Sequence, residues 1–266
     1  MTKKIETATI TTLKEYAEFI ETNLASAKKP LWYRGVNTTD RELIPRLYKH
    51  PKNLGVVDVI ALETKMMQTF KERCVPYLVR NIVSEWEYLF LMQHFGVPTR
   101  LLDWTENPFI GLYFAIAHLK PESNGDAVIW VLNPNNWNKT VLGQTGDGEV
   151  LSKDHELLAG YAPALNPELV RENPIMMYGI HNSPRIVSQK GVFTIFGKSN
   201  KSMESLYTSM DFPDKTLAKI ILPQKNLKEL SHSLISIGFS ESMLFPDLEG
   251  LAREIRRANG FEALHV

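Results

Sequence analysis

The sequence has little cysteine, no excess of charge of either sign and no long apolar run. A single cysteine, Cys74, excludes an internal disulfide and any zinc site built from several cysteines, which fits a reducing cytoplasm. Lys plus Arg and Asp plus Glu both number 30, so no overall basic field favours nucleic acid. The first residues lack the apolar stretch of a signal peptide, and no window approaches the ~18 apolar residues of a membrane span. We therefore expect a cytoplasmic protein with no membrane association.

Several catalytic motifs are also missing. The sequence contains no GxxxxGK[ST] loop and no GxGxxG after a strand, which excludes P-loop and Rossmann nucleotide sites. HExxH and GxSxG are absent, and the 7 histidines show no paired spacing typical of metal ligands. No metal is expected.

The composition that remains is that of a globular protein, with 44% hydrophobic and 23% charged residues in 266 positions. Helical and strand patterns are mixed without regular alternation, so we predict an α+β fold with helices around a central mixed or antiparallel sheet. The whole chain, 1–266, is interpreted as one domain with an elaborated polar, lid-like insertion at about 133–182. Helices are expected at 12–27, 56–80 with a break at Pro76, 226–237 and 246–258, and strands at 31–33, 127–132, 185–188, 192–196 and 217–222.

The densest signal is the segment from Glu85 to His118, EWEYLFLMQHFGVPTRLLDWTENPFIGLYFAIAH. Two apolar helical patterns, 88–94 and 108–118, flank a turn that carries Arg100 and Asp103. Arg and Asp are almost never fully buried unless they are paired, so these residues either satisfy each other or face a pocket. We predict that Asp103 orients Arg100, and that Arg100 shares one cavity with Arg34.

Together with the tripeptide Tyr33-Arg34-Gly35, this segment resembles the FRG domain, a family named for its Phe-Arg-Gly motif, with Tyr33 in place of the Phe. The resemblance continues through PRIVSQKGVFTIFG, which holds Arg185 and Gln189, and ends at LFPDLEGLAREI.

A second resemblance is to the ADP-ribosyltransferase superfamily. Tyr33-Arg34-Gly35 is similar to the Arg-Gly motif of the arginine-type transferases, and Gly111-Leu112-Tyr113-Phe114-Ala115 looks like the Gly-x-Tyr-Phe segment of the poly-ADP-ribose polymerases. Late acidic residues, Asp247 and Glu249, complete that order. The resemblance implies an ADP-ribosyltransferase-like fold, NAD as the substrate, and an NAD-dependent ADP-ribosyltransferase or NAD glycohydrolase of the kind found in toxins and phage-defence systems.

The chemistry assigns roles within this resemblance. Cleavage of the nicotinamide–ribose bond builds positive charge on the ribose, which a carboxylate stabilises; Glu249 is favoured for this role over Asp247. An Arg fork clamps a pyrophosphate, which suits Arg34 or Arg100, and Tyr113 stacks on nicotinamide. The expected catalytic residues are Glu249, Arg34 and Asp247, and the expected cofactor-binding residues are Arg34, Arg100, Tyr113, His94, Asp103, Arg185 and Gln189.

Plainer interpretations stay open for several of these residues. Arg34 and Asp103 can form a structural ion pair, Tyr113 can be core, and Asp247 can cap the last helix.

Two other functions stay open as well. In a nucleic-acid-processing or binding domain, Arg34, Arg100, Arg185 and Lys190 would contact phosphate while Trp32, Trp104 and Phe193 stack on bases. A non-catalytic partner-binding module would instead close Arg34, Arg100 and Asp103 into a network without a cavity. The sequence leaves the partner open between NAD or another nucleotide and an unknown protein or nucleic-acid acceptor.

Overall fold

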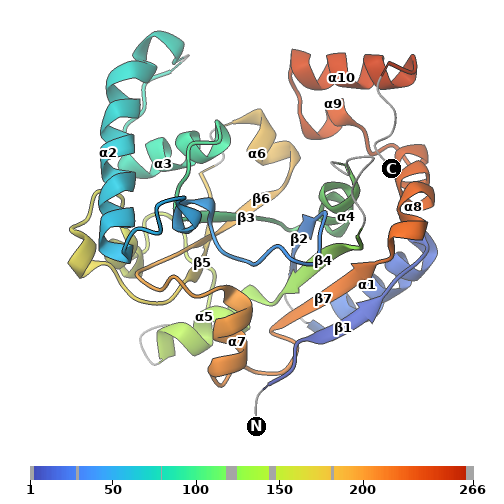
Figure 1. The fold of residues 1–266 in the computed structure, drawn as a ribbon, viewed down its shortest axis with the longest axis horizontal. Coiled ribbons are helices and arrows are strands. Elements are labelled where there is room, and N and C mark those ends of the chain that lie inside the picture. Colours follow the sequence, from blue (N-terminus) through green and yellow to red (C-terminus); the bar gives the residue numbers. More distant parts are fainter. Residues whose placement is uncertain are drawn as a thin grey trace.

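The computed structural model describes residues 3–27, 30–78, 80–117, 125–143, 148–180 and 183–261. Its centre is a seven-stranded sheet in the order β1-β7-β4-β2-β3-β6-β5 (Figure 1). β1 and β7 pair in parallel and every other neighbouring pair is antiparallel, so the predicted α+β class with a mixed sheet is confirmed. The strands are β1 (Glu6–Thr9), β2 (Trp32–Val36), β3 (Leu101–Thr105), β4 (Ala127–Leu132), β5 (Ile175–Tyr178), β6 (Gly191–Ile195) and β7 (Leu217–Leu222).

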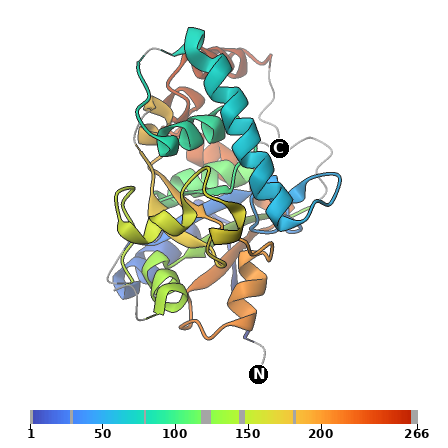
Figure 2. The same cartoon turned by 90° about the vertical axis from the view of Figure 1, so that its left-hand side faces the viewer.

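Helices cover both faces of this sheet. They are α1 (Leu13–Ala27), α2 (Val56–Cys74), α3 (Glu85–His94), α4 (Pro108–Ile116), α5 (Pro134–Leu142), α6 (Pro184–Ser188), α7 (Met203–Ser209), α8 (Gln224–Ser236), α9 (Glu241–Leu244) and α10 (Leu248–Ala258). Figures 1 and 2 show α2 and α3 at the end of the molecule that holds β3, β5 and β6, and Figure 1 shows α1 and α8 at the opposite end. No helix in the described ranges is long and apolar enough to cross a bilayer.

The alternation of side chains along the strands divides the core. In β2, Trp32 packs with α5 and α7 on one face, whereas Tyr33 packs with α1, α4 and α8 on the other. A third apolar cluster joins α2 and α3 to β3, β5 and β6. The face that holds Trp32 is therefore covered by α5 and α7 across both halves of the sheet, whereas the opposite face is divided between the cluster around Tyr33 and the third cluster.

The two halves meet where β2 and β3 diverge. β2 pairs with β4 along its whole length, whereas within the described strands its ladder with β3 consists of the pair Tyr33–Thr105. Beyond this pair the strands separate, which leaves room for side chains between them.

Two glycines allow α4 to lie directly on β2. A Cβ atom on Gly35 would lie 2.0 Å from the backbone oxygen of Gly111 and 2.3 Å from the backbone nitrogen of Ala115. A Cβ on Gly111 would in turn lie 2.8 Å from Cβ of Tyr33. The Gly of the Tyr-Arg-Gly tripeptide thus has a packing role, as does the first Gly of the Gly-Leu-Tyr-Phe-Ala segment.

Many predicted elements are present. Thr12 and Glu15 cap α1: the Glu15 backbone nitrogen donates to Thr12 Oγ1, and the Glu15 carboxylate accepts from the Thr11 backbone nitrogen. The strands predicted at 127–132, 192–196 and 217–222 correspond to β4, β6 and β7. Pro76 follows the end of α2 as expected.

Other predictions were wrong. The supposed turn around Asp103 is strand β3, and 185–188 is part of helix α6, which Ser183 caps by accepting from the Ile186 backbone nitrogen. β2 does not end at Arg34 but continues through it to Val36.

The region 133–182 contains α5 and β5, and β5 adds a strand to the sheet, so this strand is part of the core. Its residues 144–147 and 181–182 lie outside the described residues, as does His118.

Candidate functional site

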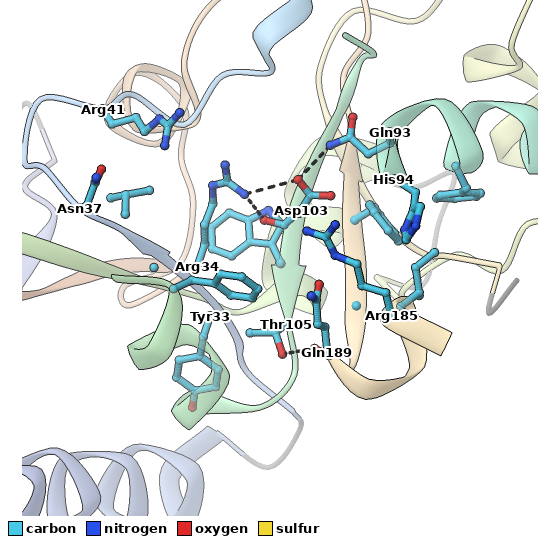
Figure 3. Close-up of a pocket in the computed structure, with 18 residues that line it drawn as sticks. Tyr33, Arg34, Asn37, Arg41, Gln93, His94, Asp103, Thr105, Arg185 and Gln189 are labelled. Carbon is cyan, nitrogen blue, oxygen red and sulfur yellow. Dashed lines mark hydrogen bonds and ion pairs between the residues drawn. The ribbon is translucent and has the colours of Figure 1, made fainter. Parts of the chain in front are cut away.

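A cavity of about 280 Å³ lies where β2 and β3 diverge (Figure 3). Strand β2 contributes Arg34, β3 contributes Asp103, α3 contributes His94, and α6 contributes Arg185. Its size is near the lower end of the ~300–1,000 Å³ range typical of small-molecule sites. The remaining lining includes five aromatic residues, Tyr33, Phe90, Trp104, Phe114 and Phe193, and the polar residues Asn37, Arg41, Gln93, Thr105 and Gln189.

Arg34 and Asp103 form the centre of the polar wall. Nη1 of Arg34 donates to the backbone oxygen of Asp103 at 2.5 Å and lies 3.9 Å from Oδ2 of its carboxylate. The amide of Gln93 donates to the same Oδ2 at 2.9 Å, and its own oxygen accepts from Thr99 Oγ1 at 2.6 Å. Figure 3 shows the Arg34 guanidinium and the Gln93 amide both pointing toward Asp103. The carboxylate is therefore held in place, yet the Asp103 side chain stays 55% exposed to solvent.

Arg185 extends from the short helix α6 on the other side of the cavity. Its guanidinium lies 4.5 Å from the ring centre of Phe245, a cation–π contact that fixes the side chain. Burial lowers the pKa of Arg185, and the charges of Asp103 and Asp247 oppose this decrease. An Arg stays protonated despite such a shift, so Arg185 is a cation partly withdrawn from water.

Gln189 follows α6 and ties this wall to its neighbours. Its side-chain amide donates to the backbone oxygen of Leu244 at 3.0 Å, and its backbone oxygen accepts from Thr105 Oγ1 at 2.7 Å. The side chain thus borders the cavity while bridging α6 to α9.

His94 is the last residue of α3 and borders the cavity. Burial lowers the pKa of His94, the charge of Arg185 lowers it further, and Asp247 opposes both effects. The imidazole is therefore neutral at pH 7, with one ring nitrogen able to accept a proton.

The cavity has a surplus of positive charge. Arg34, Arg41 and Arg185 line it together with one carboxylate, Asp103. Figure 3 shows Arg41 and Arg185 on opposite sides of the Arg34–Asp103 pair. An anionic ligand is the electrostatic complement of such a site.

Two of the lining residues, Tyr33 and Trp104, have a buried polar group without a hydrogen-bond partner within the described residues. Trp104 is 3% exposed, and its indole Nε1 has no hydrogen-bond partner within the described residues. A buried donor without a partner is costly, and a bound ligand or water is a common explanation.

Five predicted site residues are brought together: Arg34, His94, Asp103, Arg185 and Gln189. Sequence reasoning missed Arg41, Gln93 and Phe114. Gln93 and Phe114 lie next to the predicted residues His94 and Tyr113 in the sequence. This proximity is the only sequence signal that could have indicated them. Arg41 lies in an exposed loop and carries no sequence signal.

Arg100 does not share this cavity, and Asp103 does not orient it. Arg100 is 1% exposed and its Nε donates to Oε2 of Glu63, on α2, at 2.7 Å. Its other nitrogens donate to the backbone oxygens of Tyr161 at 3.1 Å and Phe196 at 3.4 Å. Both predictions about Arg100 were wrong, because a buried guanidinium takes the carboxylate that packs against it, and here α2 supplies one. Arg100 is a structural residue.

The other predicted residues also lie outside the cavity. Tyr113 is buried, and its hydroxyl donates to Glu241 at 3.1 Å; Phe114 lines the cavity instead. Asp247 caps α10, with Oδ1 accepting from the Gly250 backbone nitrogen at 2.7 Å. Glu249 pairs with Arg253 at 2.5 Å and is 72% exposed. Both acids act on Arg185 electrostatically, but neither provides the carboxylate of the cavity.

Possible metal ligands do not gather at this site. In the described part of the chain, no three His, Cys, Asp or Glu side chains lie close enough together to hold a metal ion.

Comparison with known protein families gives a match to part of the chain. No curated protein and no solved structure matches the chain. Residues 29–124 of the 266 match the family model of the FRG domain. This range contains Arg34, Gln93, His94 and Asp103, whereas Arg185, Gln189 and the late acidic residues lie beyond it. Over residues 29–124, the part of the chain that builds the Arg34–Asp103 centre, the match supports the FRG family.

Proposed function

We propose that the protein binds NAD in this cavity and cleaves the bond between nicotinamide and ribose, as an NAD glycohydrolase or an ADP-ribosyltransferase-like enzyme. One observation carries the proposal: Arg34, Arg185 and the exposed carboxylate of Asp103 line a single cavity with aromatic walls. Such a set offers cations for a pyrophosphate, a carboxylate for a developing cation, and rings for a planar base.

The cations match the charge of a dinucleotide. A guanidinium binds phosphate through two parallel hydrogen bonds, which a Lys cannot reproduce. Nη1 of Arg34 is already engaged with Asp103, so its remaining N–H groups are the ones available to phosphate oxygens. Arg185 provides the second cation, and its contact with Phe245 limits the side-chain entropy lost on binding.

The carboxylate of Asp103 takes the role that the sequence gave to Glu249. In the reaction, the N-glycosidic bond breaks and its electron pair leaves with nicotinamide. Water or an acceptor then forms the new bond to the ribose carbon and releases a proton. Asp103 stabilises the positive charge that develops on the ribose, while neutral His94 accepts the proton released by the nucleophile. The acceptor of a transferred ADP-ribose is a protein or a nucleic acid.

The aromatic walls suit the nicotinamide ring. Phe114 borders the cavity with a ring that is only partly buried, and aromatic rings prefer offset or edge-to-face contacts with other rings. The cavity encloses part of a dinucleotide, so the adenosine half extends beyond it. Consumption of NAD fits the role of a toxin or phage-defence effector.

Burial argues against the nucleic-acid alternative. Trp32 is fully buried, Trp104 is 3% exposed and Phe193 is 4% exposed, so none offers an open ring face for a stack of bases. Arg100, expected to contact phosphate, is closed in its pair with Glu63.

The test is release of nicotinamide from NAD by the purified protein. The wild type should release nicotinamide, and Asp103→Asn should release it roughly 100-fold more slowly, the scale of one lost preorganised contact. Glu249→Gln, made in parallel, separates the two carboxylates. Loss of turnover in Glu249→Gln with full turnover in Asp103→Asn would assign the stabilising carboxylate to Glu249 in α10 and not to Asp103. Absence of nicotinamide release and of NAD binding by the wild type would contradict the proposal.

A further inference from the structure

A second cavity, of about 270 Å³, adjoins the first across the Arg34–Asp103 pair. Arg34, Arg41, Gln93 and Asp103 line both cavities, so the ion pair forms a shared wall. A ligand longer than the first cavity can therefore continue into the second past Arg34.

The second cavity is richer in cations than a neutral ligand requires. Besides Arg34 and Arg41 it is lined by Arg46 and Lys49, both from the short 3₁₀ helix Arg46–Lys49. Glu42 and Asp103 are the acidic residues of its lining, and Glu42 lies 3.7 Å from Lys49. Within the described residues, Arg41 and Arg46 have no carboxylate partner. Clustered like charges repel each other, so an anion bound between them stabilises the cluster.

Part of the lining is apolar. Ile44 and Val97, which are both partly buried, border the cavity. A flat base can lie on such a surface while its sugar and phosphate face the cations.

We propose that this second cavity binds the adenosine half of the dinucleotide, and that its cations hold a 2′-phosphate, so that NADP⁺ is preferred to NAD⁺. The inference rests on the proposed function. The pyrophosphate lies in the middle of a dinucleotide, and Arg34 lies between the two cavities, so Arg34 is its natural partner. Arg41, Arg46 and Lys49 remain beyond that point. NAD⁺ has no further anionic group on its adenosine half, whereas NADP⁺ has one, and Arg is a residue that accommodates it.

The test compares two ligands that lack the scissile bond, ADP-ribose and 2′-phospho-ADP-ribose, by titration calorimetry on the full chain. The wild type should bind the phosphorylated ligand at least about tenfold more tightly, because it gains charge-assisted hydrogen bonds. Arg46→Gln and Lys49→Gln should each bring the ratio of the two dissociation constants toward one. Lys52→Gln removes an exposed cation of the same segment that lines neither cavity, and it should retain the wild-type ratio.

Circular dichroism and melting curves verify that each variant is folded. Equal affinity for the two ligands in the wild type would overturn the inference, as would a ratio that Arg46→Gln and Lys49→Gln leave unchanged.

Nicotinamide release from NAD⁺ and NADP⁺ separates this inference from the proposed function. Preferred binding of the phosphorylated ligand without release from either dinucleotide would support the phosphate site and contradict the reaction. Equal release from both dinucleotides, with equal affinities for the two products, would support the reaction and contradict the phosphate site. If neither product binds, both proposals fall.

Discussion

Arg34 joins β2 to β3 through Asp103 at the point where the two strands no longer pair. Its guanidinium donates to the Asp103 backbone oxygen at 2.5 Å and lies 3.9 Å from the Asp103 carboxylate. The pair is therefore a structural bridge between the two strands, as the plainer interpretation expected. The carboxylate is also accessible in a cavity, so the same pair is available for chemistry.

Replacing Asp103 should separate activity from stability. Asp103→Asn keeps the shape of the side chain and leaves the backbone oxygen that accepts from Arg34. A partly exposed ion pair contributes about 0–1 kcal/mol, so the free energy of unfolding should fall by no more than about that amount. Nicotinamide release should fall by about 100-fold or more. Urea denaturation and the release assay provide the two measurements.

A matched control for Asp103→Asn is Glu85→Gln. Glu85 is also a partly exposed acid in an ion pair, with Lys71, and it lines neither cavity. It should lose a similar amount of stability and no activity. A large loss of stability in Asp103→Asn alone would make Asp103 a structural residue.

Arg34→Lys should fail to rescue the loss seen in Arg34→Gln. An ammonium is a point charge, whereas the guanidinium can hold the Asp103 backbone oxygen and a phosphate at once. We expect ADP-ribose to bind Arg34→Lys at least about tenfold more weakly than the wild type, which corresponds to about 1.4 kcal/mol. Calorimetric titration measures this. Wild-type affinity in Arg34→Lys would show that charge alone is sufficient at this position.

Gly35→Ala should destabilise the fold. The added Cβ would lie 2.0 Å from the backbone oxygen of Gly111, so α4 would have to move away from β2. Overpacking of this kind costs about 1–3 kcal/mol or more, measured as a lower midpoint of urea denaturation. Gly125→Ala is the control, because a Cβ there meets nothing within 4 Å. A Gly35→Ala variant as stable as wild type would contradict the packing role of this glycine.

The sequence predicts elements best where local signals are long. The capping box before α1 and the continuous apolar run of β4 identify both elements without tertiary information. α6 has five residues, too few for helical periodicity to distinguish it from a strand. β3 was missed because Asp103 interrupts its apolar run, and the reason for that interruption, the divergence of β2, is a tertiary feature.

The site residues show the same division. Arg34, His94 and Asp103 were identified because charged or polar residues in apolar surroundings are unusual and match a family motif. The partner of Arg100 was not identifiable, because Glu63 lies 37 positions earlier on a helix whose sequence also contains exposed charges. Pairing across that distance depends on how α2 packs.

Removing the Arg100 guanidinium should lower the free energy of unfolding without abolishing the activity of the folded protein. Arg100→Met leaves Glu63 buried at 2% exposure without its cation, and breaking a buried pair in this way costs about 3–5 kcal/mol. Because Arg100 lines neither cavity, the fraction that remains folded should still release nicotinamide. Replacing both partners, Glu63→Leu with Arg100→Met, should recover part of the lost stability. A stable Arg100→Met variant without activity would place Arg100 in the site after all.

The pH dependence of stability should carry a contribution from His94. Burial and Arg185 lower its pKa in the folded protein, whereas the unfolded chain has the ordinary value of about 6.5. Above that pH the imidazole is neutral in both states and contributes no pH dependence. As the pH falls below about 6.5, the unfolded state binds the proton first, so the free energy of unfolding decreases until the folded pKa is also passed.

His94→Gln removes this contribution. Urea denaturation at pH 7.5 and at pH 5.5 should therefore show a smaller decrease in the free energy of unfolding for the variant than for the wild type. His232→Gln, at an exposed position of α8, is the matched control and should keep the larger decrease. Equal decreases in the wild type and His94→Gln would mean that the folded protein does not disfavour the charged imidazole.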